Sequence, residues 1–238
     1  MLKLEIGLRR GKILLQKSML RLLSVADVVS LVNVIFGFLA IIMIYLDETR
    51  LGFSFILLAL LADGLDGIVA RKLSKSKLGD YFEAMGDITS MGVASALFVY
   101  SIYYSSISWC PFYHGYLFIV LIVFLASGVI RLASFHVMKD KKFFVGIPIP
   151  ASTIIIVVLA YLGISFWIIL PVILVVSLAM VSNVRFPKLG YRIHVVAVLL
   201  IFLTLIIDKI YYSIAPILLL LAIFVYAFFG PVYLWRRR

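Results

Sequence analysis

The chain has a single cysteine, Cys110, and few acidic residues. One cysteine excludes a disulfide within the chain and a zinc site built from cysteines. Asp and Glu number 11 against 22 Lys and Arg, which gives a formal charge of +11. No basic face with stacking aromatics is available outside the apolar runs, so we expect no nucleic-acid partner. The cations are better explained as anchors at the surface of a membrane.

Hydrophobic residues make up 65% of the chain, which is more apolar surface than a soluble domain buries. Several runs reach the ~18–20 residues needed to cross a hydrocarbon core of ~30 Å. The sequence therefore predicts an all-α, polytopic transmembrane bundle of about eight spans. An amphipathic, basic helix lying in the interface is predicted before it, in residues 1–24. The apolar runs lie at about 28–46, 51–70, 80–104, 116–137, 147–163, 165–182, 193–207 and 213–235.

Lys and Arg clusters in the connections predict the topology. With eight spans, all the clusters fall on one side, whereas seven spans would separate the loop at Arg185 from the Arg tail. The positive-inside rule then places both termini, and the active site proposed below, in the cytosol of a multi-pass cell-membrane protein. The clusters lie in the N-terminal segment, 71–77, 139–142, 185–192 and 236–238.

Four carboxylates interrupt the second and third apolar runs: Asp63, Asp66, Glu83 and Asp87. A lone carboxylate in a transmembrane helix costs about 2.5–3.5 kcal/mol even on the insertion scale. Four of them so close together require neutralisation, and hard divalent cations prefer carboxylate oxygens. Helical spacing places the first two acids on one stripe and the last two on another. The alternative is that the first two acids pair with Arg71 near the cytosolic boundary.

These residues resemble the signature of the CDP-alcohol phosphotransferase family, Asp-x2-Asp-Gly-x2-Ala-Arg followed by Gly-x3-Asp-x3-Asp. One position departs, because Glu83 stands where the family has its third aspartate; Asp80 is a neighbour that would partly compensate. The stretches SLVNVIFGFLAI, SGVIRLASFHV, FVGIPIPAS and LAMVSNVRFPKL are most similar to the serine-using branch, whose archaeal members use CDP-archaeol. The matching signature residues are Asp63, Asp66, Gly67, Ala70, Arg71, Gly79 and Asp87.

The resemblance implies a metal-dependent transfer from CDP-diacylglycerol or CDP-archaeol to L-serine, with release of CMP, by a homodimer. It implies two Mg²⁺ or Mn²⁺ ions on Asp63, Asp66, Glu83 and Asp87, and Asp87 as the general base. It divides the chain into the N-terminal segment 1–24, a six-helix core at 25–190 and two additional spans at 191–238. The nucleotide pocket it implies comprises Asn33, Asp63, Gly67, Ala70, Arg71 and Gly79.

Several alternatives stay open at this point. Asn33 could equally serve an interhelical hydrogen bond. Arg131 could bind the serine carboxylate or a lipid phosphate, or extend to the headgroups. Pro148 and Pro150 are expected to shape the start of the fifth span. Competing functions are a sibling enzyme acting on inositol phosphate or glycerol phosphate, an ion-coupled transporter, and an inactive homologue. An aromatic interface belt is expected at Tyr103, Tyr104, Trp109, Phe112 and Tyr113.

Overall fold

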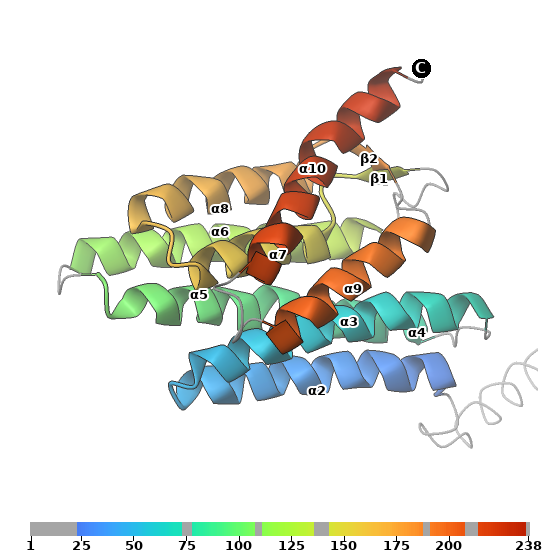
Figure 1. Ribbon diagram of the computed structural model, residues 1–238, viewed down its shortest axis with the longest axis horizontal. Helices are drawn as coiled ribbons and strands as arrows, with labels where there is room; N and C mark the ends of the chain where they lie inside the picture. The colour runs from blue at the N-terminus through green and yellow to red at the C-terminus, as the bar shows by residue number, and fades with distance from the viewer. Residues whose placement is uncertain are drawn as a thin grey trace, which may run out of the picture.

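The computed structural model describes residues 23–72, 78–107, 111–135, 143–187, 191–207 and 214–236, without the side chains at 26, 66–72, 135, 191–194 and 207. The interfacial helix predicted in residues 1–24 lies outside this part, which begins at Leu23. The described chain is predominantly helical (Figure 1), and α4, η2 and α5 follow one another without a break. The elements are α2 (Val25–Tyr45), α3 (Thr49–Lys72), α4 (Gly79–Asp87), the π-helix η2 (Ile88–Ala94), α5 (Ser95–Tyr104), α6 (Pro111–Phe135), β1 (Phe143–Val145), α7 (Ile149–Tyr161), α8 (Phe166–Val181), β2 (Arg185–Pro187), α9 (Tyr191–Ile207) and α10 (Ile214–Arg236).

Among the described residues, four helical stretches are long and apolar enough to span a membrane: Asp27–Tyr45, Gly79–Tyr104, Pro111–Ser134 and Ile214–Arg236. Three further apolar helices are shorter: Ile149–Tyr161, Phe166–Val181 and Val195–Ile206. Large apolar side chains are exposed on the flanks, which is the surface that a hydrocarbon environment favours. The chain is therefore a helical membrane protein, and the count of eight spans stays a prediction.

Helix α7 forms the centre of the bundle. Every residue from Ala151 to Ala160 is buried, and none is charged. A helix that is apolar all round has to be covered on all sides by other helices. Its polar side chains are satisfied inside the protein, since Thr153 Oγ1 donates to the Met91 carbonyl of η2 at 3.0 Å. This bond joins the central helix to the turn that follows Asp87.

The π-helix η2 begins directly after Asp87, and α2 lies very close to it. A Cβ atom added at Gly37 would lie 2.8 Å from Ser90 Cα, so only glycine allows α2 this approach. The Ser95 hydroxyl donates to the Ser90 carbonyl at 3.1 Å, which satisfies a backbone acceptor in the widened turn. Local widening of this kind is frequent at functional sites.

A two-stranded antiparallel sheet joins the connections after α6 and α8, and the sequence did not predict it. Phe144 pairs with Phe186, with Phe143 opposite Pro187 and Val145 opposite Arg185. Arg185 also lies over the Phe143 ring, 4.5 Å from its centroid. Strands of three residues carry too little alternation to be recognised from sequence. The sheet ties together two loops that are far apart in the chain.

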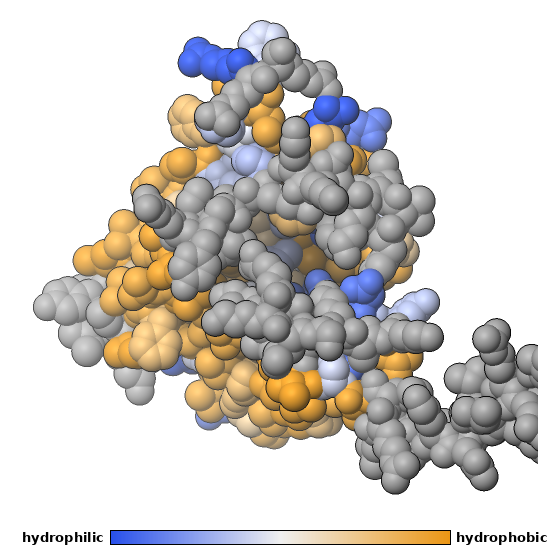
Figure 2. Space-filling view, turned by 90° about the vertical axis from the view of Figure 1, so that its right-hand side faces the viewer, coloured by the Kyte–Doolittle hydropathy of each residue, from blue (hydrophilic) through white to orange (hydrophobic). Residues whose placement is uncertain are grey.

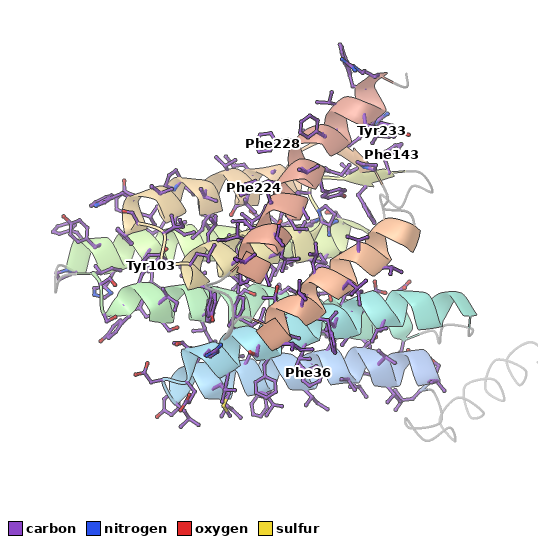
Figure 3. All side chains as sticks on the ribbon, in the orientation of Figure 1. Phe36, Tyr103, Phe143, Phe224, Phe228 and Tyr233 are labelled. Atoms are coloured by element: carbon purple, nitrogen blue, oxygen red, sulfur yellow. The ribbon has the colours of Figure 1, made fainter. Side chains whose placement is uncertain are left out.

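The two ends of the molecule differ in character. The C-terminal end of α3, the start of α4, the β1–β2 sheet and the C-terminal end of α10 lie toward one end (Figure 1). Viewed from that end, hydrophilic residues show between apolar flanks (Figure 2). Tyr103 lies at the opposite end from Phe143 and Tyr233 (Figure 3). There it takes part in an aromatic cluster with Phe166, Tyr113 and their neighbours, in the region where the sequence suggested an aromatic belt.

Candidate active site

A cavity of about 280 Å³ lies between α3, α4, α6, α7, α9 and α10. Most of its wall is apolar, but five ionisable side chains reach it from four different helices. They are Asp63 of α3, Glu83 and Asp87 of α4, Arg131 of α6 and Tyr226 of α10. Ionisable side chains are rare inside apolar helices of a membrane protein. The convergence of these five on one cavity marks the cavity as the candidate active site.

The acids occupy one side of this cavity. Glu83 and Asp87 lie one turn apart on α4, so their side chains share a helix face, as the spacing predicted. Asp63 reaches the same cavity from α3. Asp87 is 5% exposed, whereas Asp63 and Glu83 are half-buried. The most deeply buried of these acids is therefore the one that immediately precedes the π-helix.

Two successive hydrogen bonds hold the Asp87 carboxylate in place. Asn33 Nδ2 of α2 donates to Asp87 Oδ1 at 3.1 Å, and the Ser90 hydroxyl donates to Asn33 Oδ1 at 2.7 Å. Asn33 and Ser90 are fully buried. The asparagine therefore makes the interhelical hydrogen bond that was one of its two predicted roles, and it is not among the residues that line the cavity. Its role in nucleotide binding stays a prediction.

Arg131 is the buried cation of the site. The residue is 8% exposed, and its Nε has no hydrogen-bond partner in the described part of the protein. Asp63, Asp87 and Tyr226 line the same cavity as this residue. A buried, incompletely bonded guanidinium is costly unless an anion meets it. Its burial shows that the side chain lies among the helices and does not extend to the surface.

The entry into α7 completes the cavity beside Arg131. Gly146 has a φ of +73°, and a Cβ there would collide with the Met180 carbonyl, so glycine is required. Its amide donates to the Val184 carbonyl at 2.8 Å. The chain then turns into α7, where Pro148 is the N-cap and Pro150 lies in the first turn. Both prolines line the cavity, so they shape the helix start as expected and also form part of the site.

Several predicted residues lie outside what the structure describes or away from the cavity. The backbone of α3 includes Asp66, Gly67, Ala70 and Arg71, but their side chains are not described. Gly79 is buried at the start of α4 and is not among the lining residues. The metal-binding and nucleotide-binding roles of all of these stay predictions.

The donor set suits a hard divalent ion, as carboxylate oxygens from α3 and α4 face one cavity. Among the described residues, no three His, Cys, Asp or Glu side chains are grouped closely enough to form a metal site. The side chain of Asp66 lies outside the described part of the protein. The residues present therefore fit the implied ions in chemistry, and Asp63, Glu83 and Asp87 are the described candidates to hold them.

Sequence reasoning missed Tyr226 and Ser90. A tyrosine in a terminal span is typical of an interface anchor, so nothing in its surroundings distinguished it. Ser90 could have been found from its spacing, since it lies three residues after Asp87 and a helix would place both on one face. Its link to Asn33 required the packing of α2 on η2.

Comparison with known proteins places the chain in a family of membrane transferases. The sequence profile of the CDP-alcohol phosphatidyltransferase family matches residues 23–181. The chain belongs to this family. The matched region includes Asp63, Glu83, Asp87 and Arg131, and it ends before β2, α9 and α10.

The relatives narrow the likeness further. The chain is 31% identical over 179 residues to the CDP-diacylglycerol–serine O-phosphatidyltransferase of Methanocaldococcus jannaschii, covering 75% of this chain and 81% of the relative. It is 34% identical over 168 residues to the Helicobacter pylori protein of the same name, covering 62% and 66%. It is 28% identical over 177 residues to the archaetidylserine synthase of Methanothermobacter thermautotrophicus, covering 72% and 73%. Within the family, the chain is thus similar to serine phosphatidyltransferases.

Proposed function

We propose that this protein transfers a phosphatidyl-type group from a CDP-lipid to the hydroxyl of L-serine and releases CMP. The observation that carries the proposal is the convergence of Asp63, Glu83, Asp87 and Arg131 on one cavity. Three acids suit a cation-bound diphosphate, and the buried arginine suits a second anion. The names of the relatives support serine as the acceptor.

Asp63, Asp66, Glu83 and Asp87 are the residues that would hold divalent ions, Mg²⁺ or Mn²⁺ and two in number. When bound, such ions neutralise charge on the diphosphate and make CMP a better leaving group. Glu83 keeps the charge of the family aspartate on a longer stem, and it faces the same cavity as Asp63 and Asp87. This shared orientation supports an active enzyme over an inactive homologue.

Asp87 serves as the general base. The serine oxygen forms a bond to the phosphorus that bears the lipid, the bond from that phosphorus to the CMP oxygen breaks, and the hydroxyl proton passes to the Asp87 carboxylate. The Asn33 amide holds Oδ1 of this carboxylate at 3.1 Å, which limits the orientations the base can adopt. We infer a single displacement, because no nucleophilic Ser–His or Cys–His pair occurs beside the signature in the sequence.

Arg131 binds the acceptor. A guanidinium donates two parallel hydrogen bonds to a carboxylate. The Nε–H of Arg131 is a donor without a partner among the described residues. Acceptors that carry a phosphate would favour several cations, whereas the described lining residues of the cavity include one, Arg131. This difference favours serine over inositol phosphate or glycerol phosphate.

The assembly around this site follows from the same proposal. Asn33, Asp63, Gly67, Ala70, Arg71 and Gly79 form the nucleotide pocket. The active site and both termini face the cytosol, the core is 25–190 with additional spans at 191–238, and the enzyme is a homodimer. The gathering of the α3 end, the sheet and the α10 end at one end of the molecule supports a common side for the basic clusters (Figure 1).

The decisive experiment uses purified protein with CDP-diacylglycerol or CDP-archaeol, Mg²⁺ or Mn²⁺, and a panel of acceptors, with CMP release as the readout. We expect serine to stimulate CMP release and the phosphorylated acceptors to have no effect. Asp63→Asn should abolish the serine-dependent release, whereas Asp47→Asn, at an exposed turn residue, should leave it unchanged. Release of CMP with a phosphorylated acceptor alone would assign the protein to a sibling activity. Absence of CMP with every acceptor would contradict the proposal.

A further inference from the structure

Helices α9 and α10 close one side of the cavity. The residues they contribute are Ala197, Val198 and Ile201 from α9, and Ile223 and Tyr226 from α10. Four of these five side chains are apolar, and Tyr226 supplies the one hydroxyl. Both helices follow residue 181, where the match to the family profile ends. This wall is therefore a feature of the chain beyond the family-matched region.

The sheet holds Tyr226 in place. Its hydroxyl donates to the Pro187 carbonyl of β2 at 3.2 Å, and its ring lies 6.0 Å from that of Phe186. One turn later on α10, a Cβ added at Gly230 would lie 2.9 Å from Pro187 Cδ, so the helix fits closely against β2. The position of the phenol thus depends on the β1–β2 connection.

Tyr226 is also a neighbour of the buried arginine. Both side chains line the main cavity, Tyr226 from α10 and Arg131 from α6. Arg131 also lines a second cavity of about 80 Å³, whose wall includes the β1 residues Phe143, Phe144 and Val145. Arg131 therefore borders two cavities. A long side chain with several rotamers binds an anion well only when one orientation is favoured.

We propose that Tyr226 is a positioning residue that keeps the Arg131 guanidinium turned toward the reaction cavity, so that α10 completes the binding site for an acceptor that carries a carboxylate. The inference rests on the proposed function for the identity of the acceptor. The phenol oxygen provides a polar neighbour on a wall that is otherwise apolar. Without it, the guanidinium gains freedom to turn toward the second cavity, and the acceptor loses a preorganised partner.

Tyr226→Phe tests this role because it keeps the ring and removes only the hydroxyl. The matched control is Tyr233→Phe, a half-exposed tyrosine on the same helix. CMP release is measured against serine at saturating CDP-lipid, and against CDP-lipid at saturating serine. We expect the serine KM of Tyr226→Phe to rise about 10-fold, as for a lost contact to a charged group. Its kcat and its KM for CDP-lipid should stay within about twofold of wild type. A serine KM within twofold of wild type would overturn the proposal, as would an equal fall in all parameters.

A double-mutant cycle with Arg131→Lys separates positioning from independent binding. If Tyr226 acts through Arg131, the hydroxyl should have little left to contribute once the guanidinium is gone. The double variant should then resemble Arg131→Lys alone in serine KM. If the rise in serine KM of the double variant equalled the product of the rises in the two single variants, the positioning role would be overturned.

The reactivity of Arg131 toward phenylglyoxal gives a readout that does not depend on the acceptor. Modification of the peptide that contains this residue is followed by mass spectrometry in folded protein. A slower reaction in Tyr226→Phe than in Tyr233→Phe is expected, because the guanidinium then spends part of its time turned into the smaller second cavity. Equal rates would overturn the inference even if serine proved not to be the acceptor. If the wild-type protein released no CMP in response to serine, that result would instead count against the proposed function alone.

Discussion

The two walls of the cavity differ in chemistry and in the way they are held. The first, from α3, α4 and α6, carries Asp63, Glu83, Asp87 and Arg131. Behind it, one directional hydrogen bond from Asn33 orients the buried Asp87 carboxylate. The second wall, from α9 and α10, is apolar apart from Tyr226. Its α10 part packs closely against β2, where Gly230 lies against Pro187 and the Tyr226 hydroxyl donates to the Pro187 carbonyl. Groups that carry charge need directional support, whereas the apolar side chains of the second wall exclude water and set the volume by packing alone.

Removing charge from the first wall should have the largest effect. Asp87→Asn keeps the size of the side chain but removes the proposed base and one candidate metal ligand. We expect serine-dependent CMP release to fall by about 10³-fold or more, because both proton transfer and charge stabilisation are lost. The control is Glu48→Gln, which changes an exposed acid in the turn between α2 and α3. Near-normal activity in Asp87→Asn, with an unchanged melting temperature, would show that the carboxylates of the first wall do not take part in the reaction.

The carboxylates of the first wall could be predicted from the sequence, because charged residues inside apolar runs are conspicuous. Asp63, Glu83 and Asp87 were recognised in the sequence as carboxylates that need neutralisation, and in the structure they line one cavity. The second wall could not be predicted, since its residues resemble those of any lipid-facing span. Tyr226 owes its place to Pro187, 39 residues earlier in the chain. Such a pairing depends on the fold and leaves no local pattern.

The same contrast applies to the backbone. The helical runs were visible as stretches of apolar residues, and α2, α6 and α10 coincide closely with runs read from the sequence. The π-helix after Asp87 has no sequence signature of its own. It coincides with close contact from Gly37 and with a hydrogen bond from Thr153, both contributed by other helices. Local widening of a helix is decided by such tertiary contacts, which a single sequence does not display.

Removing the support behind the first wall should have a smaller effect. Asn33→Leu preserves volume but removes the donor to Asp87 and the acceptor for Ser90. We expect kcat to fall by about 10- to 100-fold, as is usual when the group that orients a ligand or base is lost. The KM for CDP-lipid should change little, and the melting temperature should decrease because buried partners are left unsatisfied.

Ser90→Ala provides the graded control, because it retains the bond between Asn33 and Asp87. Its activity should stay within a few-fold of wild type, since the Asp87 carboxylate keeps its donor. The two variants also decide between the two roles predicted for Asn33. A rise in the KM for CDP-lipid at unchanged kcat in Asn33→Leu would indicate nucleotide binding, and orientation of Asp87 would then be contradicted.

Trimming the second wall should have the smallest effect and should alter selectivity more than rate. Ile201 is 5% exposed and lines the cavity from α9, so Ile201→Ala enlarges the space without touching a charge. Methylene-sized differences in an apolar pocket change discrimination by about 10-fold. We expect kcat/KM for threonine or homoserine to rise by about that factor relative to serine, while serine itself stays within about threefold. Leu199 lies on the same helix and is 60% exposed. Leu199→Ala should therefore leave the ratio of kcat/KM between these acceptors and serine unchanged. If Ile201→Ala instead abolished turnover at an unchanged melting temperature, the second wall would take part in the chemistry, and the division between a charged wall and a wall that sets volume would be wrong.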